Sequence, residues 1–317
     1  MAVLYVCFFF LLPSFELLCF VVAIIPVLCF QGTDSSVFTQ LLVTAIPGPC
    51  SCDSKSHTTH HCSDAARKEV PVECGVKYGP KEGQILDLFG GKSLPHDAPI
   101  LVYIHGGYWQ ELSRDISAYC VVPQYQSGIR VIILGYDLAP RVKLSEIVEE
   151  IKEAAEYILN MAAKFGTRSL WFCGHSAGAQ LVAMLLFSKW LDQLDDSVFR
   201  LLKGFVLISG VYDLTPLVST YINNSLKLSS QEARSLSPLL LDITSPAVTK
   251  LRILVAVGDH DSPEFQRQSY EFAEKLRQHS QQVEYMTVAG VDHFDIVENL
   301  QQKDFILTKI IGVLMTG

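Results

Sequence analysis

From about Val70 onward the chain alternates between short apolar runs and longer stretches with a helical period. Six runs predict strands, and most of them are continuously apolar, as expected for strands buried on both faces: "APILVYIHGG", "IRVIILGYD", "SLWFCG", "GFVLISG", "LRILVAVGD" and "QVEYMTVAG". Between the second and third runs, "SEIVEEIKEAAEYILNMAAKFG" predicts an amphipathic helix that stops at Gly166. "EFQRQSYEFAEKLRQH" predicts another helix. Strands that alternate with helices predict a mostly parallel sheet covered on both faces.

Other segments extend or interrupt this alternation of strands and helices. "VPVECGVKYG" and "GQILDLFGG" predict a hairpin of two short strands ahead of the alternation. Helices are expected from Ser176 to about Lys189 and from Ile296 to the end of the chain. Residues 212–248, rich in Ser, Leu and Pro, break the alternation and predict a small cap or insertion. Residues 63–317 are therefore expected to form one α/β domain.

Residues 1–62 have a different character. Residues 1–30 are apolar apart from Glu16 and are long enough to cross a bilayer, so a contact with the membrane is one interpretation. A signal peptide is another, although its usual positive start is missing, because the first basic residue is Lys55. The stretch from Pro49 to Cys62 mixes cysteine with histidine, but its spacing fits a zinc site poorly, and we interpret it as a polar linker.

Composition narrows the class of protein. The chain has 317 residues, of which 49% are hydrophobic and 18% charged, so it can bury a substantial core. A net charge of −8 and the absence of a Lys/Arg cluster argue against nucleic acid as a partner. Only two of the nine cysteines, Cys120 and Cys173, lie beyond the first quarter of the chain. A disulfide framework would spread cysteines through the domain, so the main body is predicted to be reduced and intracellular.

One glycine-flanked serine is the first candidate for chemistry. The pattern G-x-S-x-G runs from Gly174 to Gly178, with Ser176 at its centre, after a predicted strand and before a predicted helix. This strand–turn–helix context is the one that a nucleophile elbow requires. The alternative is a serine that merely caps a helix in a glycine turn.

A serine nucleophile needs a base and an acid, which in this fold follow it in the order acid, then histidine. His293 follows the last predicted strand, whereas His279 lies on a predicted helix. The acid should follow the preceding strand, where Asp259 and Asp261 both lie. We prefer Asp261, which is farther into the loop, and expect Asp259 to cap or orient that loop; a helix cap is the alternative role for Asp261.

"HGGYW", His105 to Trp109, directly follows the strand "ILVYI". The backbone N–H groups of Gly106 and Gly107, with that of Ala177 after the nucleophile, are the candidate oxyanion donors. His105 is expected to orient its loop by hydrogen bonding. Tyr108 and Trp109 could form an aromatic wall for substrate. These parts predict a serine hydrolase that needs neither a metal nor an organic cofactor.

Five motifs together resemble kynurenine formamidase (arylformamidase) of the animal type: "HGGYWQ", "CGHSAGAQLVAMLL", "GVYDLTPLV", "GDHDSPEFQRQSYEF" and "GVDHFDIVENL". The resemblance runs from about Ser63 to the C-terminus. It implies an α/β-hydrolase fold and cleavage of N-formyl-L-kynurenine to L-kynurenine and formate in tryptophan catabolism, through a formyl-enzyme on Ser176. It carries the family's triad and HGGxW motif onto Ser176, Asp261, His293 and residues 105–109, and it implies a cytoplasmic, also nuclear, homodimer.

The chain departs from this family before Ser63, where members are usually polar and charged. Residues 1–62 could therefore be an endoplasmic reticulum membrane anchor, a signal or an alternative start. The second enzyme hypothesis is a membrane-anchored carboxylesterase or arylacetamide deacetylase of the hormone-sensitive-lipase type. Those enzymes usually carry HGGG, and Tyr108 stands here where the last glycine would be. A catalytically inactive binding protein of the same fold is a third hypothesis, which loss of a triad residue would favour.

Overall fold

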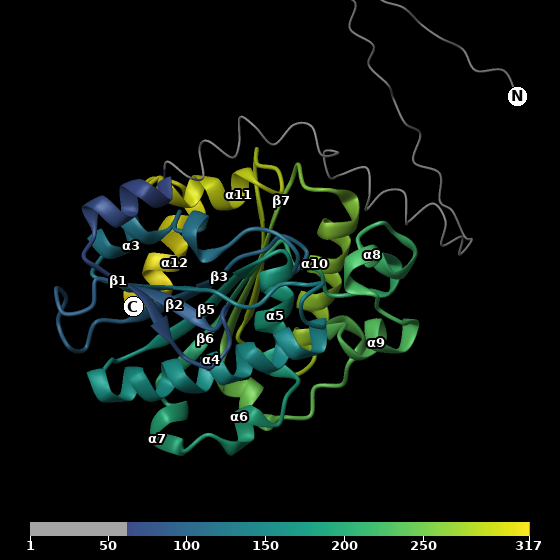
Figure 1. Ribbon diagram of the computed structural model, residues 1–317, viewed down its shortest axis with the longest axis horizontal. Coiled ribbons are helices and arrows are strands. Elements are labelled where there is room, and N and C mark those ends of the chain that lie inside the picture. The colour runs from purple at the N-terminus through teal and green to yellow at the C-terminus, as the bar shows by residue number, and fades with distance from the viewer. Residues whose placement is uncertain (1–61, 317) are drawn as a thin grey trace, which may run out of the picture. The chain divides into compact units, whose positions relative to one another are not determined.

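A computed structural model describes residues 62–316 of the chain (Figure 1). Within them, eight strands form one sheet in the order β1-β2-β4-β3-β5-β6-β7-β8. The strands are β1 (Val72–Lys77), β2 (Ile85–Phe89), β3 (Ile100–Ile104), β4 (Arg130–Leu134), β5 (Leu170–His175), β6 (Leu202–Ile208), β7 (Arg252–Gly258) and β8 (Val283–Val288). Strands β3 to β8 run parallel, whereas β2 pairs antiparallel with both β1 and β4. The predicted hairpin and the mostly parallel sheet are confirmed.

The position of β3 in this order decides where the site lies. β3 pairs with β4 on one side and with β5 on the other, so the chain turns back across β3 to reach β5. Loops that leave neighbouring parallel strands at such a switch point diverge and leave room for a ligand. Ile104, the last residue of β3, lies opposite Gly174 of β5. The two glycine motifs therefore meet at one edge of the sheet.

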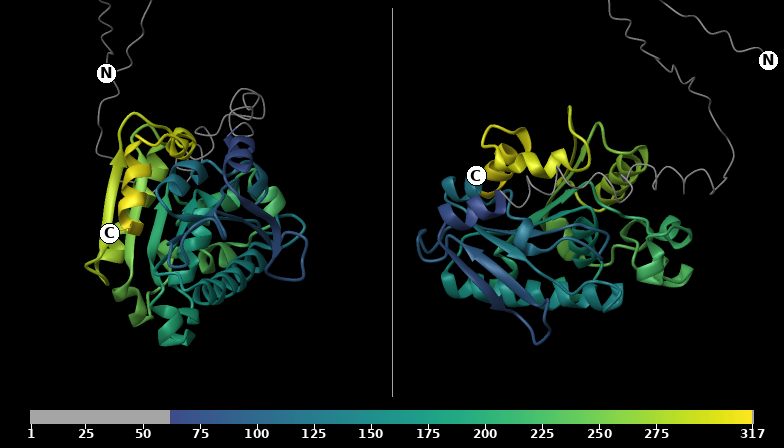
Figure 2. Two further views of the ribbon diagram at one scale, coloured as in Figure 1. Left: turned by 90° about the vertical axis from the view of Figure 1, so that its left-hand side faces the viewer. Right: turned by 45° about the horizontal axis from the view of Figure 1, so that its top comes forward.

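Alternating side chains of β3 supply two separate cores. Ile100, Val102 and Ile104 belong to the larger core, and Leu101 and Tyr103 belong to the smaller one. The larger core contains the buried sides of α4 (Leu144–Phe165), α5 (Ala177–Leu186) and α10 (Pro263–Arg277). The smaller contains those of α3 (Val121–Gln126) and α12 (Ile306–Thr316). Helices thus cover both faces of the sheet, as two further views also show (Figure 2).

The remaining helices are short. The α-helices are α6 (Trp190–Gln193), α7 (Asp196–Phe199), α8 (Asn223–Leu226), α9 (Ser230–Ser235) and α11 (Asp295–Glu298). The 3-10 helices are η1 (Arg114–Ile116), η2 (Thr215–Ser219), η3 (Pro238–Leu240), η4 (Pro246–Lys250) and η5 (Asn299–Gln301).

The predicted helices differ from the observed ones mainly at their ends. α4 ends as predicted, because Gly166 adopts the left-handed conformation with φ of 76° and satisfies the last carbonyls. α5 ends at Leu186 rather than at Lys189. The helical stretch predicted from Ile296 onward is present but interrupted: α11 and η5 are separated from α12 by residues 302–305. Apolar spacing alone did not reveal that break.

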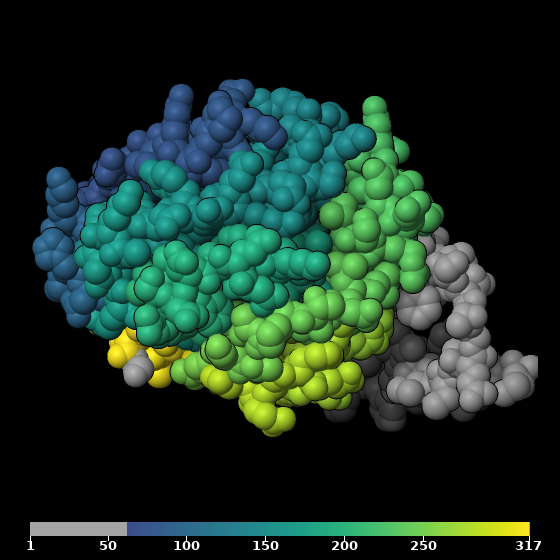
Figure 3. Space-filling view, turned by 90° about the horizontal axis from the view of Figure 1, so that it is seen from below, coloured from purple at the N-terminus to yellow at the C-terminus, as the bar shows by residue number. Residues whose placement is uncertain are grey.

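Residues 212–248 join β6 to β7 through short helical turns. η2, α8, α9 and η3 lie in this stretch, and η4 overlaps its end. Figure 3 shows these residues in green on the surface, between the teal helices that precede β6 and the yellow-green α10. This placement is compatible with the predicted cap or insertion.

The apolar segment 1–30 and the Cys/His stretch up to residue 61 lie outside the described residues, so the predicted division at residue 62 stays a prediction. The described chain begins with a helix over residues 62–69. The Cys62 thiol at its start hydrogen-bonds to Oε1 of Gln301 at 2.7 Å. Between residues 62 and 316, no helix combines the length and apolarity needed to span a membrane.

Candidate active site

Ser176 occupies a strained turn between β5 and α5. Its φ and ψ are 54° and −118°, a conformation that non-glycine residues rarely adopt outside functional sites. A Cβ on Gly174 would lie 2.3 Å from the backbone oxygen of Gly178, and one on Gly178 would lie 2.2 Å from that of Ile104. Only glycine can occupy either position without displacing the backbone. The G-x-S-x-G pattern is thus explained by backbone contacts.

The HGGYW loop lies directly beside this turn. A Cβ on Gly106 would stand 3.0 Å from the Ser176 Cβ, so the loop approaches the serine at close range. Gly107 has φ of 93°, and a Cβ there would meet the Glu111 carbonyl oxygen at 2.3 Å. In the described chain, the backbone N–H groups of Gly106 and Gly107 bind no acceptor. Ala177, the first residue of α5, has one of the N–H groups that a helix start leaves unpaired.

Asp261 and His293 come together from the loops that follow β7 and β8. His293 Nδ1 lies 2.9 Å from Asp261 Oδ2, and the other carboxylate oxygen accepts the Ser262 backbone N–H at 2.7 Å. The Asp261 side chain is fully buried, whereas that of His293 is 15% exposed. Because a carboxylate only accepts, Nδ1 carries the proton, and Nε2 of a neutral ring is left to take one.

The alternative acid and base have other surroundings. Asp259 Oδ1 accepts the Gly290 backbone N–H at 2.7 Å, which ties the loop after β7 to the loop after β8. His279 lies beyond the end of α10, with its Nδ1 3.2 Å from the Lys275 carbonyl oxygen. Of the candidates, only Asp261 and His293 form a buried acid–histidine pair.

His105, the first residue of the HGGYW loop, is buried. Its Nδ1 lies 2.9 Å from the Gly106 carbonyl oxygen, and its ring stacks on Tyr136 with centroids 4.4 Å apart. The Tyr136 hydroxyl donates to the His105 carbonyl oxygen at 2.9 Å. Burial lowers the pKa of His105 to about 4, so the ring is neutral at pH 7. These contacts are those of a residue that orients the loop.

The two aromatic residues of the HGGYW motif, Tyr108 and Trp109, differ in their burial. The Trp109 side chain is fully buried, and its Nε1–H donates to Oε1 of Gln180 on α5 at 3.1 Å. Trp109 therefore supports the loop from below, which differs from the expected aromatic wall. Tyr108 is partly exposed, has φ of 46°, and its buried hydroxyl has no hydrogen-bond partner among the described residues. Burial raises the Tyr108 pKa, with a further contribution from the charge of Asp261.

Gln180 is a site residue that the sequence analysis missed. Besides accepting from Trp109, its amide donates to the Leu236 carbonyl oxygen at 2.9 Å and so links the HGGYW loop to the stretch between β6 and β7. The available signal was a glutamine in the otherwise small and apolar run "AGAQLVAMLL". A fully buried amide in such a helix must find partners.

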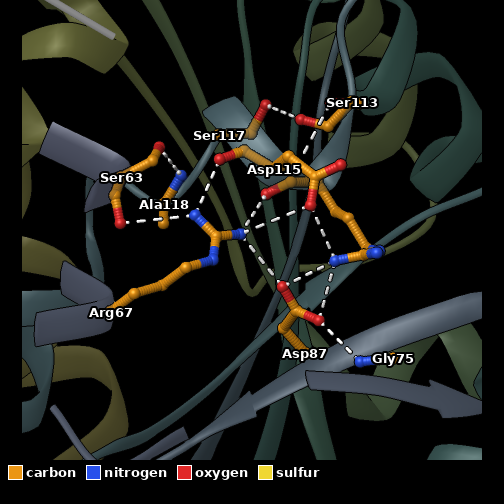
Figure 4. A network of polar contacts seen from close by, with 9 residues as sticks. Ser63, Arg67, Gly75, Asp87, Ser113, Asp115, Ser117 and Ala118 are labelled. Atoms are coloured by element: carbon orange, nitrogen blue, oxygen red, sulfur yellow. Dashed lines mark hydrogen bonds and ion pairs between the residues drawn. The ribbon is translucent and has the colours of Figure 1, made fainter. Parts of the chain in front are cut away.

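A buried carboxylate anchors the chain just after the HGGYW loop (Figure 4). Asp87 of β2 pairs with Arg114 at 2.8 Å and with Arg67 of the first described helix at 3.0 Å, and it accepts the Gly75 backbone N–H at 2.9 Å. Arg67 also donates to the Asp115 carbonyl oxygen at 2.7 Å. The network joins three separate chain segments, and periodicity gave no indication of it.

His175 is the other residue that the sequence analysis missed. It precedes Ser176, is buried, and its Nε2 lies 2.9 Å from the His293 carbonyl oxygen. A cavity of about 650 Å³ elsewhere, against α10 and residues 239–243, is lined by His279 but by none of Ser176, Asp261 and His293. The arrangement around Ser176 can therefore supply a nucleophile, a base with its acid, and backbone donors for an oxyanion.

Known proteins share this arrangement of elements. The family model described as the alpha/beta hydrolase fold matches residues 101–295. Kynurenine formamidase of Danio rerio is 37% identical over 250 residues, which cover 78% of this chain and 84% of that protein. Kynurenine formamidase of Drosophila melanogaster is 32% identical over 246 residues, covering 76% of this chain and 81% of that protein.

A solved structure supports the fold independently of these sequences. A hyperthermophilic esterase from the archaeon Pyrobaculum calidifontis superposes with a TM-score of 0.64 at 18% identity, over 88% of this chain and 97% of that one. Identity at that level bears on the fold alone, whereas the two sequence relatives bear on the family. The chain belongs to the kynurenine formamidase family of the α/β hydrolases.

Proposed function

We propose that this protein is a kynurenine formamidase, which hydrolyses the formamide of N-formyl-L-kynurenine to L-kynurenine and formate. The observation that carries the proposal is the Asp261–His293 hydrogen bond beside the strained turn of Ser176, in a chain of this family. The membrane-anchored carboxylesterase is not favoured, because the relatives that are 32–37% identical to this chain are formamidases.

The first half of the proposed reaction forms a formyl-enzyme. His293 Nε2 removes the Ser176 hydroxyl proton while the serine oxygen attacks the formyl carbon. The negative charge that develops on the formyl oxygen is stabilised by the N–H groups of Gly106, Gly107 and Ala177. His293 then gives the proton to the anilide nitrogen, the C–N bond breaks, and L-kynurenine leaves as an aromatic amine.

The second half returns the enzyme to its starting state. Water gives a proton to His293 and attacks the formyl ester, and the same three N–H groups hold the second oxyanion. The ester bond breaks, Ser176 regains a proton from His293, and formic acid leaves and gives its proton to water as formate. Asp261, buried and bonded to Nδ1, stabilises the charged ring in both halves. The cycle uses only groups of the chain and water.

Burial favours Tyr108 over Trp109 as the residue that meets the substrate. Trp109 is fully buried and bonded to Gln180, so its ring cannot face a ligand. Tyr108 is partly exposed in the loop beside Ser176, and burial keeps its hydroxyl protonated. In the proposed complex the Tyr108 ring faces the aromatic ring of kynurenine.

Location and assembly are included in the proposal on the strength of the family resemblance alone. We infer a cytoplasmic, also nuclear, homodimer; the alternative is an endoplasmic reticulum membrane protein held by residues 1–30. Cell fractionation would separate the two locations, and light scattering of the purified protein would give its mass.

The test of the function is the release of L-kynurenine from N-formyl-L-kynurenine, followed by absorbance. Ser176→Ala is the control for the nucleophile, and a short-chain aryl ester is assayed in parallel. Rapid release that Ser176→Ala abolishes is the expected result. Ester cleavage without kynurenine release would overturn the proposal in favour of the esterase.

A further inference from the structure

His175 lies between the nucleophile and the base. It is the last residue of β5, and the next residue is Ser176. Its Nε2 lies 2.9 Å from the backbone oxygen of His293, which is 118 positions away in the sequence. A carbonyl oxygen only accepts, so Nε2 carries the proton and donates it. This bond joins the elbow to the loop of the base without involving either reacting group.

The surroundings of His175 keep its ring neutral and in this tautomer. The side chain is buried, and burial together with the adjacent His293 lowers its pKa. The centroids of the two histidine rings are 4.7 Å apart. A Cβ on Gly106 would come within 3.3 Å of His175 Nδ1, so the HGGYW loop also packs against this ring. His175 thus touches all three parts of the site.

The two ends of His293 are held by different residues. Asp261 and Phe265 fix the ring, through the 2.9 Å bond at Nδ1 and a centroid distance of 4.3 Å. His175 fixes the backbone of the same residue. Asp261 binds the ring of His293, which is joined to the backbone by rotatable bonds. It therefore controls the orientation of the ring, whereas other contacts set the position of the Cα atom. The bond from His175 ties that Cα to the end of β5, directly before Ser176.

We propose that His175 is a positioning residue, which sets the distance between the Ser176 hydroxyl and His293 Nε2 by binding the His293 carbonyl. The inference deepens the proposed hydrolase function and rests on its nucleophile and base. Errors of about 1 Å in such a placement can lower a rate about 100-fold. Because the hydrogen bond of His175 goes to the backbone of His293 and not to a reacting atom, its loss is expected to lower kcat and to leave KM nearly unchanged.

The test compares two substitutions of equal length in the full chain. His175→Gln keeps a donor near the position of Nε2, whereas His175→Met fills the space without one. We expect His175→Met to lower kcat about 10- to 100-fold with KM within about twofold, and His175→Gln to retain most of kcat. Cys173→Ala, a buried substitution two residues earlier in β5, is the control for stability and is expected to keep kcat.

Two results would overturn the proposal: a kcat of His175→Met within about twofold of the parent, or equal losses of kcat in the Met and Gln variants. Should His175→Met fail to fold, His175→Asn, whose shorter amide cannot reach the carbonyl, takes its place against Gln. The rate at which a fluorophosphonate probe labels Ser176 is measured in all variants. Labelling that is slower in the Met variant but not in the Gln variant supports the role of His175, even if N-formyl-L-kynurenine proves not to be the substrate.

Discussion

Backbone conformation and packing hold Ser176 in place, whereas hydrogen bonds that involve side chains hold His293 in place. The serine half combines positive φ at Ser176 and Gly107 with glycines that exclude any Cβ. In the His293 half, Gly258 packs against the loop, where a Cβ would lie 2.3 Å from the Val291 backbone oxygen, but the ring is held by its bond to Asp261 and the carbonyl by the bond from His175. Backbone packing therefore fixes the Ser176 turn, and two side chains, Asp261 and His175, hold His293 by hydrogen bonds.

The difference has a physical reason. A nucleophile attached to a sharp turn gains its orientation from torsion angles, which sequence-adjacent glycines control. A base must exchange a proton in each half of the reaction, so its ring needs a partner that stabilises both charge states, which a buried carboxylate supplies. Substitutions in the two halves are consequently expected to fail in different ways, the serine half by misfolding and the base half by losing rate.

The largest expected effect is on catalysis, in the base half. Asp261→Asn is expected to lower kcat about 10⁴-fold, because an amide at this position can donate to Nδ1 and stabilise the wrong tautomer of His293. Steady-state kinetics with N-formyl-L-kynurenine, alongside circular dichroism, measures it. Asp259→Asn, at the carboxylate that accepts the Gly290 N–H, is the matched control. An equal loss in both variants would contradict the assignment of the acid.

The next effect is on folding, in the serine half. Gly178→Ala places a Cβ 2.2 Å from the Ile104 carbonyl oxygen and 2.5 Å from that of His105, so α5 must move away from β3. We expect a loss of about 3 kcal/mol or more in the free energy of unfolding, measured by chemical denaturation. Gly91→Ala, whose Cβ meets only Leu88 at 3.8 Å, is the control and is expected to be nearly neutral. Similar stability of the two variants would refute the steric account of the elbow.

A smaller effect concerns pH and the buried histidine of the HGGYW loop, His105. Folding holds the pKa of His105 at about 4, below the usual value of 6.5. The unfolded chain therefore binds this proton first, and stability falls as pH drops from about 6.5 to about 4, by about 3 kcal/mol for this group. Thermal melts across this range should show a shallower decline for His105→Gln. His279→Gln, which removes an exposed ring, should follow the parent; a decline in His105→Gln as steep as in the parent would rule out this role for His105.

Patterns along the sequence were sufficient for the sheet and for the loops that carry the candidate site residues. The buried strands, the hairpin and the end of α4 at Gly166 follow from apolar periodicity and glycine geometry, which are local properties. Because the carboxyl ends of parallel strands lie at one edge, the order of the motifs predicted that Ser176, Asp261 and His293 would gather. The sequence patterns did not predict the break after η5 or the early end of α5, because tertiary packing rather than the spacing of apolar residues decides where these helices end.

What the sequence by itself determined is thus the backbone: which runs form strands, where glycine is obligatory, and which loops carry the candidate residues. Only the tertiary structure decided which side chains meet. It directed Trp109 inward onto Gln180, placed two arginines on the buried Asp87, and brought His175 against the carbonyl of His293. Backbone torsion angles depend on residues that are neighbours in the sequence. The hydrogen bond between His175 and His293, 118 positions apart, forms only once the sheet has formed.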